Sequence, residues 1–286
     1  MFRILQSCSA VSVIGRCIGR VAAAGKAQYP IPMYANAWLV QHKGQKPGEY
    51  PSGGPVAKMM DVWRAAAPGI NFQAPDIYLD DFKAVCAEYT QNGNPLFIPE
   101  ANGDGRAGLK AIYALGHHHA LGFSPFGIDS VSETNGLRDA YDMPGSLLPL
   151  MAQHQGKDPL QGFLRDKDEE RLEFDLGDFR AEIEYHSGIE VRSGAGLVIA
   201  LAPDAFVDYS IRFASRRDLP GHAAWLSIDE WVPPSPGKSS LASRKIGPLP
   251  GLDLVLGRRL NGDEASYRVD LGPKLRILLG KVYRFQ

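Results

Sequence analysis

A single glutamate, Glu100, directly follows a short apolar segment in the sequence GNPLFIPEAN. Residues 95–98 lie between a Gly/Asn turn signal and this carboxylate, and such a run is typical of a short buried strand. A carboxylate just beyond a strand that helices cover occupies the position where (β/α) barrel enzymes place their catalytic groups. The sequence therefore makes Glu100 a candidate catalytic carboxylate. The alternative interpretation is a capping or loop glutamate without chemistry.

Polar and aromatic side chains follow three further apolar segments of the same kind. They are Asn36 and Trp38, Asp76 and Tyr78, and Asp129, while Asn102 accompanies Glu100. Because the C-terminal ends of parallel strands meet on one face, we expect these side chains to converge. Aromatic rings beside carboxylates and amides suit a sugar, whose C–H faces stack on rings and whose hydroxyls need donors and acceptors.

Strands and helices are predicted to alternate between residues 31 and 129. Strands are expected at residues 31–39, 72–79, 96–99 and 121–128, with a helix after each of the first three. Alternation at this spacing predicts βαβ units and a parallel sheet. The expected fold is therefore α/β in this part of the chain.

The three helices are predicted from their apolar spacing and their terminal residues. The first begins at Pro55 and buries one face, formed by Val56, Met59, Met60 and Trp63. The second is capped by Asp80 or Asp81, ends at Gly93, and buries Phe82, Val85, Cys86 and Tyr89. The third spans residues 106–119 and places Leu109, Ile112, Tyr113 and Gly116 on one face.

The apolar period changes to two from residue 171 onward. Alternation in segments 172–176, 179–185, 196–201, 209–213, 224–228, 267–271 and 275–279 is typical of antiparallel strands with one solvated face. We predict an all-β sandwich here, interrupted by a Pro/Ser/Gly-rich loop at 233–257. The expected organisation is an unassigned segment at 1–20, a barrel domain at 21–160 and a β-sandwich domain at 161–286.

Composition excludes several classes of function. A net charge of −1 gives no indication of nucleic-acid or membrane-surface binding, and no apolar run is long enough to span a bilayer. The three cysteines show no metal-ligand spacing, and consecutive histidines at 117–119 point about 100° apart on a helix. We therefore expect no metal and no cofactor. The basic and apolar start of the chain loosely resembles a signal peptide, with a stray terminus as the alternative.

Long segments of the chain resemble family 35 glycoside hydrolases. In the barrel part they are PMYANAWL, PGEYPSGGPVAKMMDVWRAAAPGINFQAPDIYL and NPLFIPEAN. In the later part RLEFDLGDFRAEIEYHSG, LVIALAPDAF, RRLNGDEASYRVDLG and LRILLGKVYRF are similar to a domain of unknown function, DUF5597, which follows the barrel in the bacterial β-galactosidase-like group. The similarity covers residues 21–231 and 257–285.

The resemblance implies the C-terminal half of a (β/α)8 barrel and a retaining β-galactosidase. Such enzymes use two carboxylates about 5–5.5 Å apart and form a covalent glycosyl-enzyme intermediate. Glu100 matches the family's nucleophile at the end of its seventh strand. Asn36, Trp38 and Tyr78 would line the pocket for a β-galactoside, and no cofactor is implied.

The chain departs from this family in one important respect. The acid/base glutamate ends the fourth barrel strand, and the first four strands would precede residue 21, where residues 1–20 do not resemble the family. An N-terminally truncated, impaired enzyme is therefore expected, with an open sheet edge that invites self-association. Two alternatives stay open: a non-catalytic carbohydrate-binding or structural remnant, and half of a split enzyme completed by another chain.

Overall fold

The computed structural model describes residues 2–42 and 44–130, then Leu137, Tyr141, residues 151–154, Gly156 and eight strand segments between 160 and 284. Contacts divide the chain into two compact units. One contains Met1–Gly103 and His118–Ser130, and the other contains Asp104–His117 and Val131–Gln286. The domain boundaries expected after residues 20 and 160 stay a prediction.

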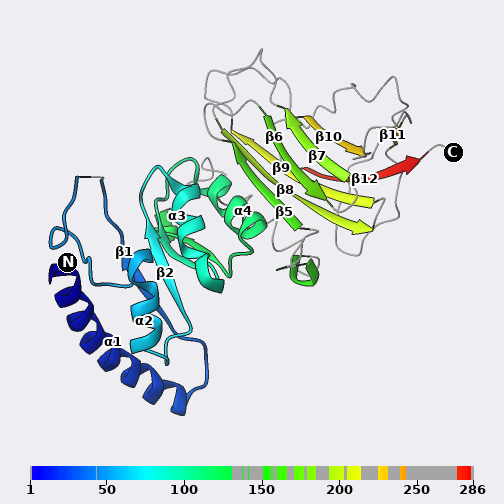
Figure 1. The fold of residues 1–286 in the computed structure, drawn as a ribbon. Helices are drawn as coiled ribbons and strands as arrows, with labels where there is room; N and C mark the ends of the chain where they lie inside the picture. Colours follow the sequence, from blue (N-terminus) through cyan, green and yellow to red (C-terminus); the bar gives the residue numbers. More distant parts are fainter. Residues whose placement is uncertain are drawn as a thin grey trace. The chain divides into compact units, whose positions relative to one another are not determined.

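A four-stranded parallel sheet forms the centre of the first unit. Its strands are β1 (Tyr34–Trp38), β2 (Phe72–Ile77), β3 (Ile98–Ala101) and β4 (Phe123–Pro125), in the order β1-β2-β3-β4. All three pairings are parallel, and the order of the strands follows the chain. Figure 1 labels β1 and β2 of this sheet. The predicted parallel sheet is confirmed, and the fold is mixed α/β. The further step to half of a barrel stays a prediction.

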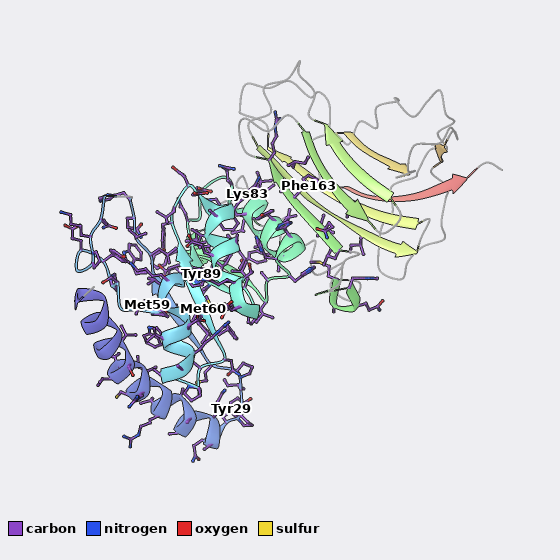
Figure 2. The ribbon with its side chains drawn as sticks, in the orientation of Figure 1. Tyr29, Met59, Met60, Lys83, Tyr89 and Phe163 are labelled. Atoms are coloured by element: carbon purple, nitrogen blue, oxygen red, sulfur yellow. The ribbon has the colours of Figure 1, made fainter. Side chains whose placement is uncertain are left out.

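Helices connect the strands and bury the faces that the sequence predicted. Between β1 and β2 lie a 3-10 turn, η1 (Ala57–Met59), and α2 (Met60–Ala66), whose buried side chains include Met59, Met60 and Trp63. Between β2 and β3 lie α3 (Phe82–Tyr89) and η2 (Gln91–Gly93), and α3 buries Phe82, Val85, Cys86 and Tyr89. Figure 2 labels Met59 and Met60 at the start of α2 and Tyr89 on α3.

The first residues of the chain form one helix, α1 (Phe2–Gln28), which covers nearly all of the segment 1–20 that the sequence leaves unassigned. Glycines allow this helix to approach the end of α2. A Cβ added at Gly19 would lie 2.7 Å from Cα of Ala67, and one at Gly15 would lie 2.8 Å from Cβ of Ala66. Within the described residues, no helix has the length and apolar character needed to cross a membrane.

Several predicted helix ends are wrong. Pro55 precedes η1 instead of occupying the first helical position, because Val56 is the N-cap. Asp81 is the N-cap of α3, but its side chain makes no capping hydrogen bond. The helix ends at Tyr89 with Thr90 as C-cap, so Gly93 lies beyond it in the left-handed region, at φ +70°. At the end of α3, the hydroxyl of Thr90 donates to the carbonyl oxygens of Cys86 and Ala87, so Thr90 and not Gly93 caps this end.

The second unit contains α4 (Ala107–His117) and two antiparallel sheets. One sheet has the order β10-β7-β6, from β6 (Arg171–Leu176), β7 (Phe179–Glu184) and β10 (Trp225–Glu230). The other has the order β11-β12-β9-β8-β5, from β5 (Leu160–Arg165), β8 (Ser193–Ala202), β9 (Ala205–Phe213), β11 (Ser239–Ala242) and β12 (Arg276–Arg284). The predicted antiparallel strands are confirmed where they are described. Their packing as a sandwich stays a prediction.

The loop predicted at residues 233–257 is partly wrong. Residues 239–242 form β11, which pairs antiparallel with β12. Serines at two of its four positions gave no apolar alternation, so the sequence offered no strand signal there. The rest of this segment, and the strand expected at 267–271, lie outside the described residues.

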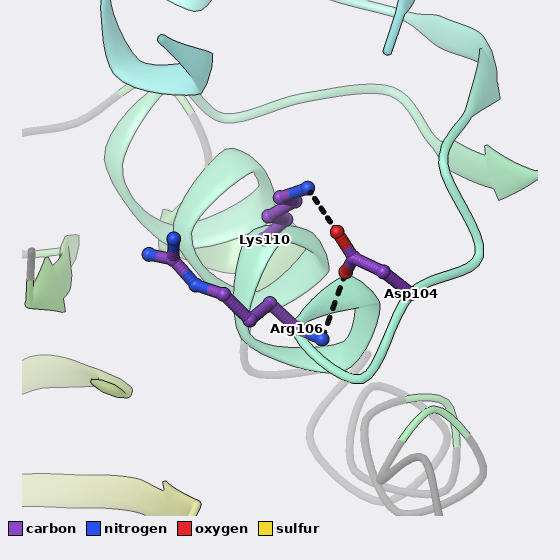
Figure 3. A network of polar contacts seen from close by, with 3 residues as sticks. All are labelled: Asp104, Arg106 and Lys110. Carbon is purple, nitrogen blue, oxygen red and sulfur yellow. Dashed lines mark hydrogen bonds and ion pairs between the residues drawn. The ribbon is translucent and has the colours of Figure 1, made fainter. Parts of the chain in front are cut away.

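Helix α4 is anchored at its start by a carboxylate and along its length by close backbone packing. Asp104 accepts hydrogen bonds from the backbone N–H of Arg106, at 2.8 Å, and from Nζ of Lys110, at 3.1 Å (Figure 3). An acceptor at this position satisfies a free N–H of the first turn. Near its end, α4 approaches β5 so closely that a Cβ added at Gly162 would lie 2.5 Å from the backbone nitrogen of His117.

Candidate functional site

The hydroxyl of Tyr78 donates a hydrogen bond of 2.5 Å to Oε1 of Glu100. Tyr78 directly follows β2 and Glu100 lies within β3, so the parallel pairing of these two strands brings the side chains together. Burial and the neighbouring charge of Glu100 raise the pKa of Tyr78 well above its ordinary value. The phenol therefore stays protonated at neutral pH and donates to the carboxylate.

A second polar pair lies beside the first. Nδ2 of Asn36 donates to Oδ2 of Asp76 at 3.0 Å, and this bond joins β1 to β2. In the sheet register, Cα of Asp76 is opposite Cα of Trp38 on one side and Cα of Glu100 on the other. Asp76 therefore stands between the strands that carry the other predicted site residues. Its side chain is only 5% exposed.

The aromatic ring of Trp38 completes the group. Its centroid lies 5.6 Å from that of Tyr78, with an angle of 44° between the ring planes, and Trp38 is 45% exposed. A half-exposed indole beside a hydrogen-bonded phenol offers an apolar face together with a polar edge. Such a surface can stack against the C–H face of a sugar while the neighbouring amide and carboxylates bind its hydroxyls.

Two structural devices hold these side chains in place. Towards the start of the strands, the rings of Tyr34, Phe72 and Phe97 contact one another, with centroid distances of 4.9–6.1 Å. At the start of β3, buried Asn94 binds both backbone groups of Gln73: its Oδ1 accepts from the N–H and its Nδ2 donates to the carbonyl. Nδ2 of Asn94 also donates to the carbonyl of Tyr89 at 2.7 Å. These bonds tie the strand of Glu100 to β2 and α3.

A pocket of about 590 Å³ adjoins the group at the edge of β1. Its lining combines apolar side chains of α1 (Val11, Ile14 and Ile18), residues Tyr34, Ala35 and Asn36 of β1, the segment Gly53–Pro55, and Trp63 of α2. Asn36 therefore faces this pocket and also binds Asp76. The pocket is mostly apolar, with one amide at the boundary to the carboxylate pair.

The structure brings together all four predicted site residues: Asn36, Trp38, Tyr78 and Glu100. It does not bring Asp129 to them, and the prediction that Asp129 ends the fourth strand is wrong. That strand ends at Pro125, and Asp129 is exposed in η3 (Ile128–Ser130). Asn102 is joined to the end of β2 through its backbone N–H, which donates to the carbonyl of Ile77. Two glutamates in predicted loops, Glu49 and Glu133, do not match the position of the family's acid. Glu49 accepts a hydrogen bond from the backbone N–H of Lys46, and Glu133 lies outside the described residues.

The sequence places Asp76 at a strand end but does not identify it as a site residue. It gives no indication that Asn94 supports the site. A strand-end aspartate has the same local pattern whether or not another carboxylate stands opposite it, so only the register identifies the pair. Within the described residues, no group of three metal-ligating side chains is close enough to hold a metal ion. The polar side chains at the site carry one amide, one phenol and two carboxyl groups.

The first unit is thus an α/β unit with a parallel sheet. Carboxylate, amide and aromatic side chains lie at the ends of its first three strands. Comparison with known proteins adds information on the second unit. Residues 137–272, a little under half of the chain, match the family described as a domain of unknown function, DUF5597. No curated protein matches the chain. The match confirms the part of the predicted resemblance that concerns this domain, and it contains all strands from β5 to β11.

Proposed function

We propose that the first unit carries the nucleophile side of a glycoside hydrolase site of family 35, of the retaining β-galactosidase type. The observation that carries the proposal is the hydrogen bond between Tyr78 and Glu100, with the tilted ring of Trp38 beside the ring of Tyr78. A phenol that donates to one carboxylate oxygen orients the other towards a substrate. Four parallel strands in chain order are also the arrangement of successive units in a (β/α)8 barrel.

In this mechanism a carboxylate oxygen of Glu100 attacks the anomeric carbon of a β-galactoside. The bond to the leaving oxygen breaks, and its electron pair goes to that oxygen, which takes a proton from an acid. Water then cleaves the glycosyl ester and restores Glu100. No carboxylate here matches the family's acid, so substrates with poor leaving groups are expected to react slowly, since acid–base help contributes about 10²- to 10⁴-fold.

The proposal is tested by trapping the nucleophile. The purified chain is incubated with a 2-deoxy-2-fluoro-galactoside that has a dinitrophenolate leaving group, which needs little acid help. Peptide mass spectrometry should then find one sugar attached to Glu100, and Glu100→Gln should remain unlabelled. The corresponding 2-fluoro-glucoside serves as the sugar control. If folded protein acquires no adduct, the assignment of Glu100 as nucleophile is wrong.

A non-catalytic carbohydrate-binding module is the second candidate, and the half-exposed ring of Trp38 favours it. Stacking of sugars on such rings needs no reacting carboxylate. Binding of methyl β-galactoside, followed by NMR or calorimetry, would then be lost in Trp38→Ala and kept in Glu100→Gln. Turnover or trapping that depends on Glu100 would rule this alternative out.

Self-association is part of the proposal, through the edge of β1. In the described residues β1 pairs with β2 alone, and Ile14, Tyr34 and Trp38 near this edge are all at least 43% exposed. Unpaired strand edges beside apolar side chains promote pairing between chains. Sedimentation velocity should show oligomers whose fraction falls when Tyr34 is replaced by lysine. A monomer at all concentrations would contradict this part.

A further inference from the structure

Asp76 is the most completely buried charged group of the site, and one of its two oxygens has no partner. Oδ2 accepts the hydrogen bond from Asn36, but Oδ1 is buried without a hydrogen-bond partner among the described residues. The neighbouring strand places Glu100 opposite it, since the two Cα atoms are partners in the register. Asp76 therefore combines burial, an unsatisfied oxygen and a second carboxyl group beside it.

An ionised Asp76 would be unfavourable in this position. A buried carboxylate needs donors for both oxygens, and a like charge on the next strand adds repulsion. A neutral carboxylic acid removes the repulsion and the cost of burying a charge. The Asn36 amide can only donate through Nδ2, so it marks Oδ2 as the acceptor oxygen and leaves Oδ1 to hold the proton.

We propose that Asp76 and Glu100 form a carboxyl pair in which Asp76 keeps a proton instead of ionising beside Glu100. Asp76 is then a positioning residue: it acts through Glu100 by controlling how much charge surrounds the nucleophile. Its effect on catalysis rests on the proposed function, whereas the protonation of Asp76 does not.

The electrostatics of the neighbourhood agree with this assignment. Burial is the main reason that the pKa of Asp76 rises to about 6; the hydrogen bond from Asn36 opposes the rise and the charge of Glu100 adds to it. Tyr78 and Tyr89 also face Asp76, and its charge contributes to the raised pKa of both phenols. Glu88 adds to the raised pKa of Tyr89 from α3. Because the phenols of Tyr78 and Tyr89 are neutral, Glu100 is the neighbour whose charge most affects the pKa of Asp76.

The consequence is a change of charge at the site near pH 6. Below this pH Asp76 is neutral. Above it Asp76 loses its proton, and the added negative charge beside Glu100 alters the reaction of Glu100 with a glycosyl donor. Asp76→Asn keeps the acceptor oxygen for Asn36 but can never ionise, so it should remove this step.

A direct test measures the titration of Asp76 by NMR in full-length protein with ¹³C-labelled aspartate carboxyl groups. The signal that disappears in Asp76→Asn identifies Asp76, and its midpoint is expected near pH 6. Glu100→Gln should lower this midpoint, because the repelling charge is removed. Asn36→Ala should raise it, because the ionised form loses its donor. A midpoint near pH 4 that neither variant moves would overturn the proposal.

A second measurement addresses the role in the reaction. The rate of labelling of Glu100 by the fluorinated galactoside is followed from pH 4.5 to 8. The native chain should show a step near pH 6 that is absent in Asp76→Asn, while the labelled peptide stays the same. A step that persists in this variant would refute the positioning role. If no chain is labelled, the proposed function fails, and the NMR titration still decides the carboxyl pair.

The opposite directions expected for Glu100→Gln and Asn36→Ala keep the test informative even if Asp76→Asn does not fold. Both variants retain Asp76. If Asp76 were merely structural, its titration midpoint would not rise in Asn36→Ala and fall in Glu100→Gln. In that case the aspartate signal is assigned through its response to Glu100→Gln. Equal midpoints in the two variants would also overturn the proposal.

Discussion

The Tyr78 hydroxyl and Oε1 of Glu100 lie 2.5 Å apart, across the boundary between two neighbouring parallel strands. Neither residue would have this partner without the register that sets Asp76 opposite Glu100, because Tyr78 follows Asp76 by two positions. In this hydrogen bond the proton stays on the phenol of Tyr78, and the acceptor is the carboxylate that we propose as the nucleophile. The predictions below follow from this contact and from the packing that supports it.

Replacing Tyr78 by phenylalanine should slow the labelling of Glu100. The hydrogen bond to a charged group is worth about 1.5–3 kcal/mol, which corresponds to about 10- to 100-fold in rate if the carboxylate loses its orientation. Labelling kinetics with the fluorinated galactoside measure the effect. Tyr29→Phe is the matched control, since this tyrosine is 68% exposed. Equal rates for Tyr78→Phe and the native chain would contradict a role for the phenol.

Asp76→Asn should stabilise the folded chain at pH 7.5 and leave its stability almost unchanged at pH 4. The pKa of Asp76 is raised to about 6 in the folded state, so the folded chain binds more protons than the unfolded chain between about pH 4 and 6. Stability from this group is therefore lost as the pH rises through that range. After allowance for solvent screening, the gain for the neutral variant at pH 7.5 should be on the order of 1–2 kcal/mol.

The free energy of unfolding in urea at the two pH values measures this difference. Asp80→Asn is the control, because Asp80 is exposed. A variant that is less stable than the native chain at pH 7.5 would show that ionised Asp76 stabilises the fold, contrary to the expectation.

Asn94→Ala should destabilise the first unit strongly. Its side-chain amide accepts a hydrogen bond from the backbone N–H of Gln73 and donates to the carbonyls of Gln73 and Tyr89. All three hydrogen bonds are buried. Removing the side chain leaves several buried backbone groups unsatisfied, at a cost of about 1–3 kcal/mol for each group. We expect a loss of about 2–4 kcal/mol in thermal or urea unfolding. The exposed Gln91→Ala should change stability by less than about 0.5 kcal/mol.

Gly162→Ala should weaken the packing of α4 on β5. The added Cβ would lie 2.5 Å from the backbone nitrogen of His117 and 2.7 Å from the carbonyl carbon of Gly116, and backbone cannot yield as a side chain can. Overpacking of this kind costs about 1–3 kcal/mol or more. Gly105→Ala is the control, because a Cβ there meets nothing within 4 Å. Equal melting temperatures for both variants would argue against this close contact.

Local sequence patterns predicted most of the elements but not all of their ends. Helical spacing of Met59, Met60 and Trp63, and of Val85, Cys86 and Tyr89, identified buried faces that the structure contains. Period two identified the antiparallel strands of the second unit. The ends were less predictable, as at Pro55 and Gly93, because tertiary partners compete with local caps for the same backbone groups.

The sequence by itself determined that strands and helices alternate, that Glu100 follows a buried strand and that Asn36, Trp38 and Tyr78 lie at or near strand ends. These features depend on residue types and spacing within one segment, so the chain specifies them locally. Only the tertiary structure decided which side chains meet: Tyr78 with Glu100, Asn36 with Asp76, and Asp76 beside Glu100. The physical reason is register. Each strand could be shifted along its neighbour without any change in its own pattern, and the partners would then differ.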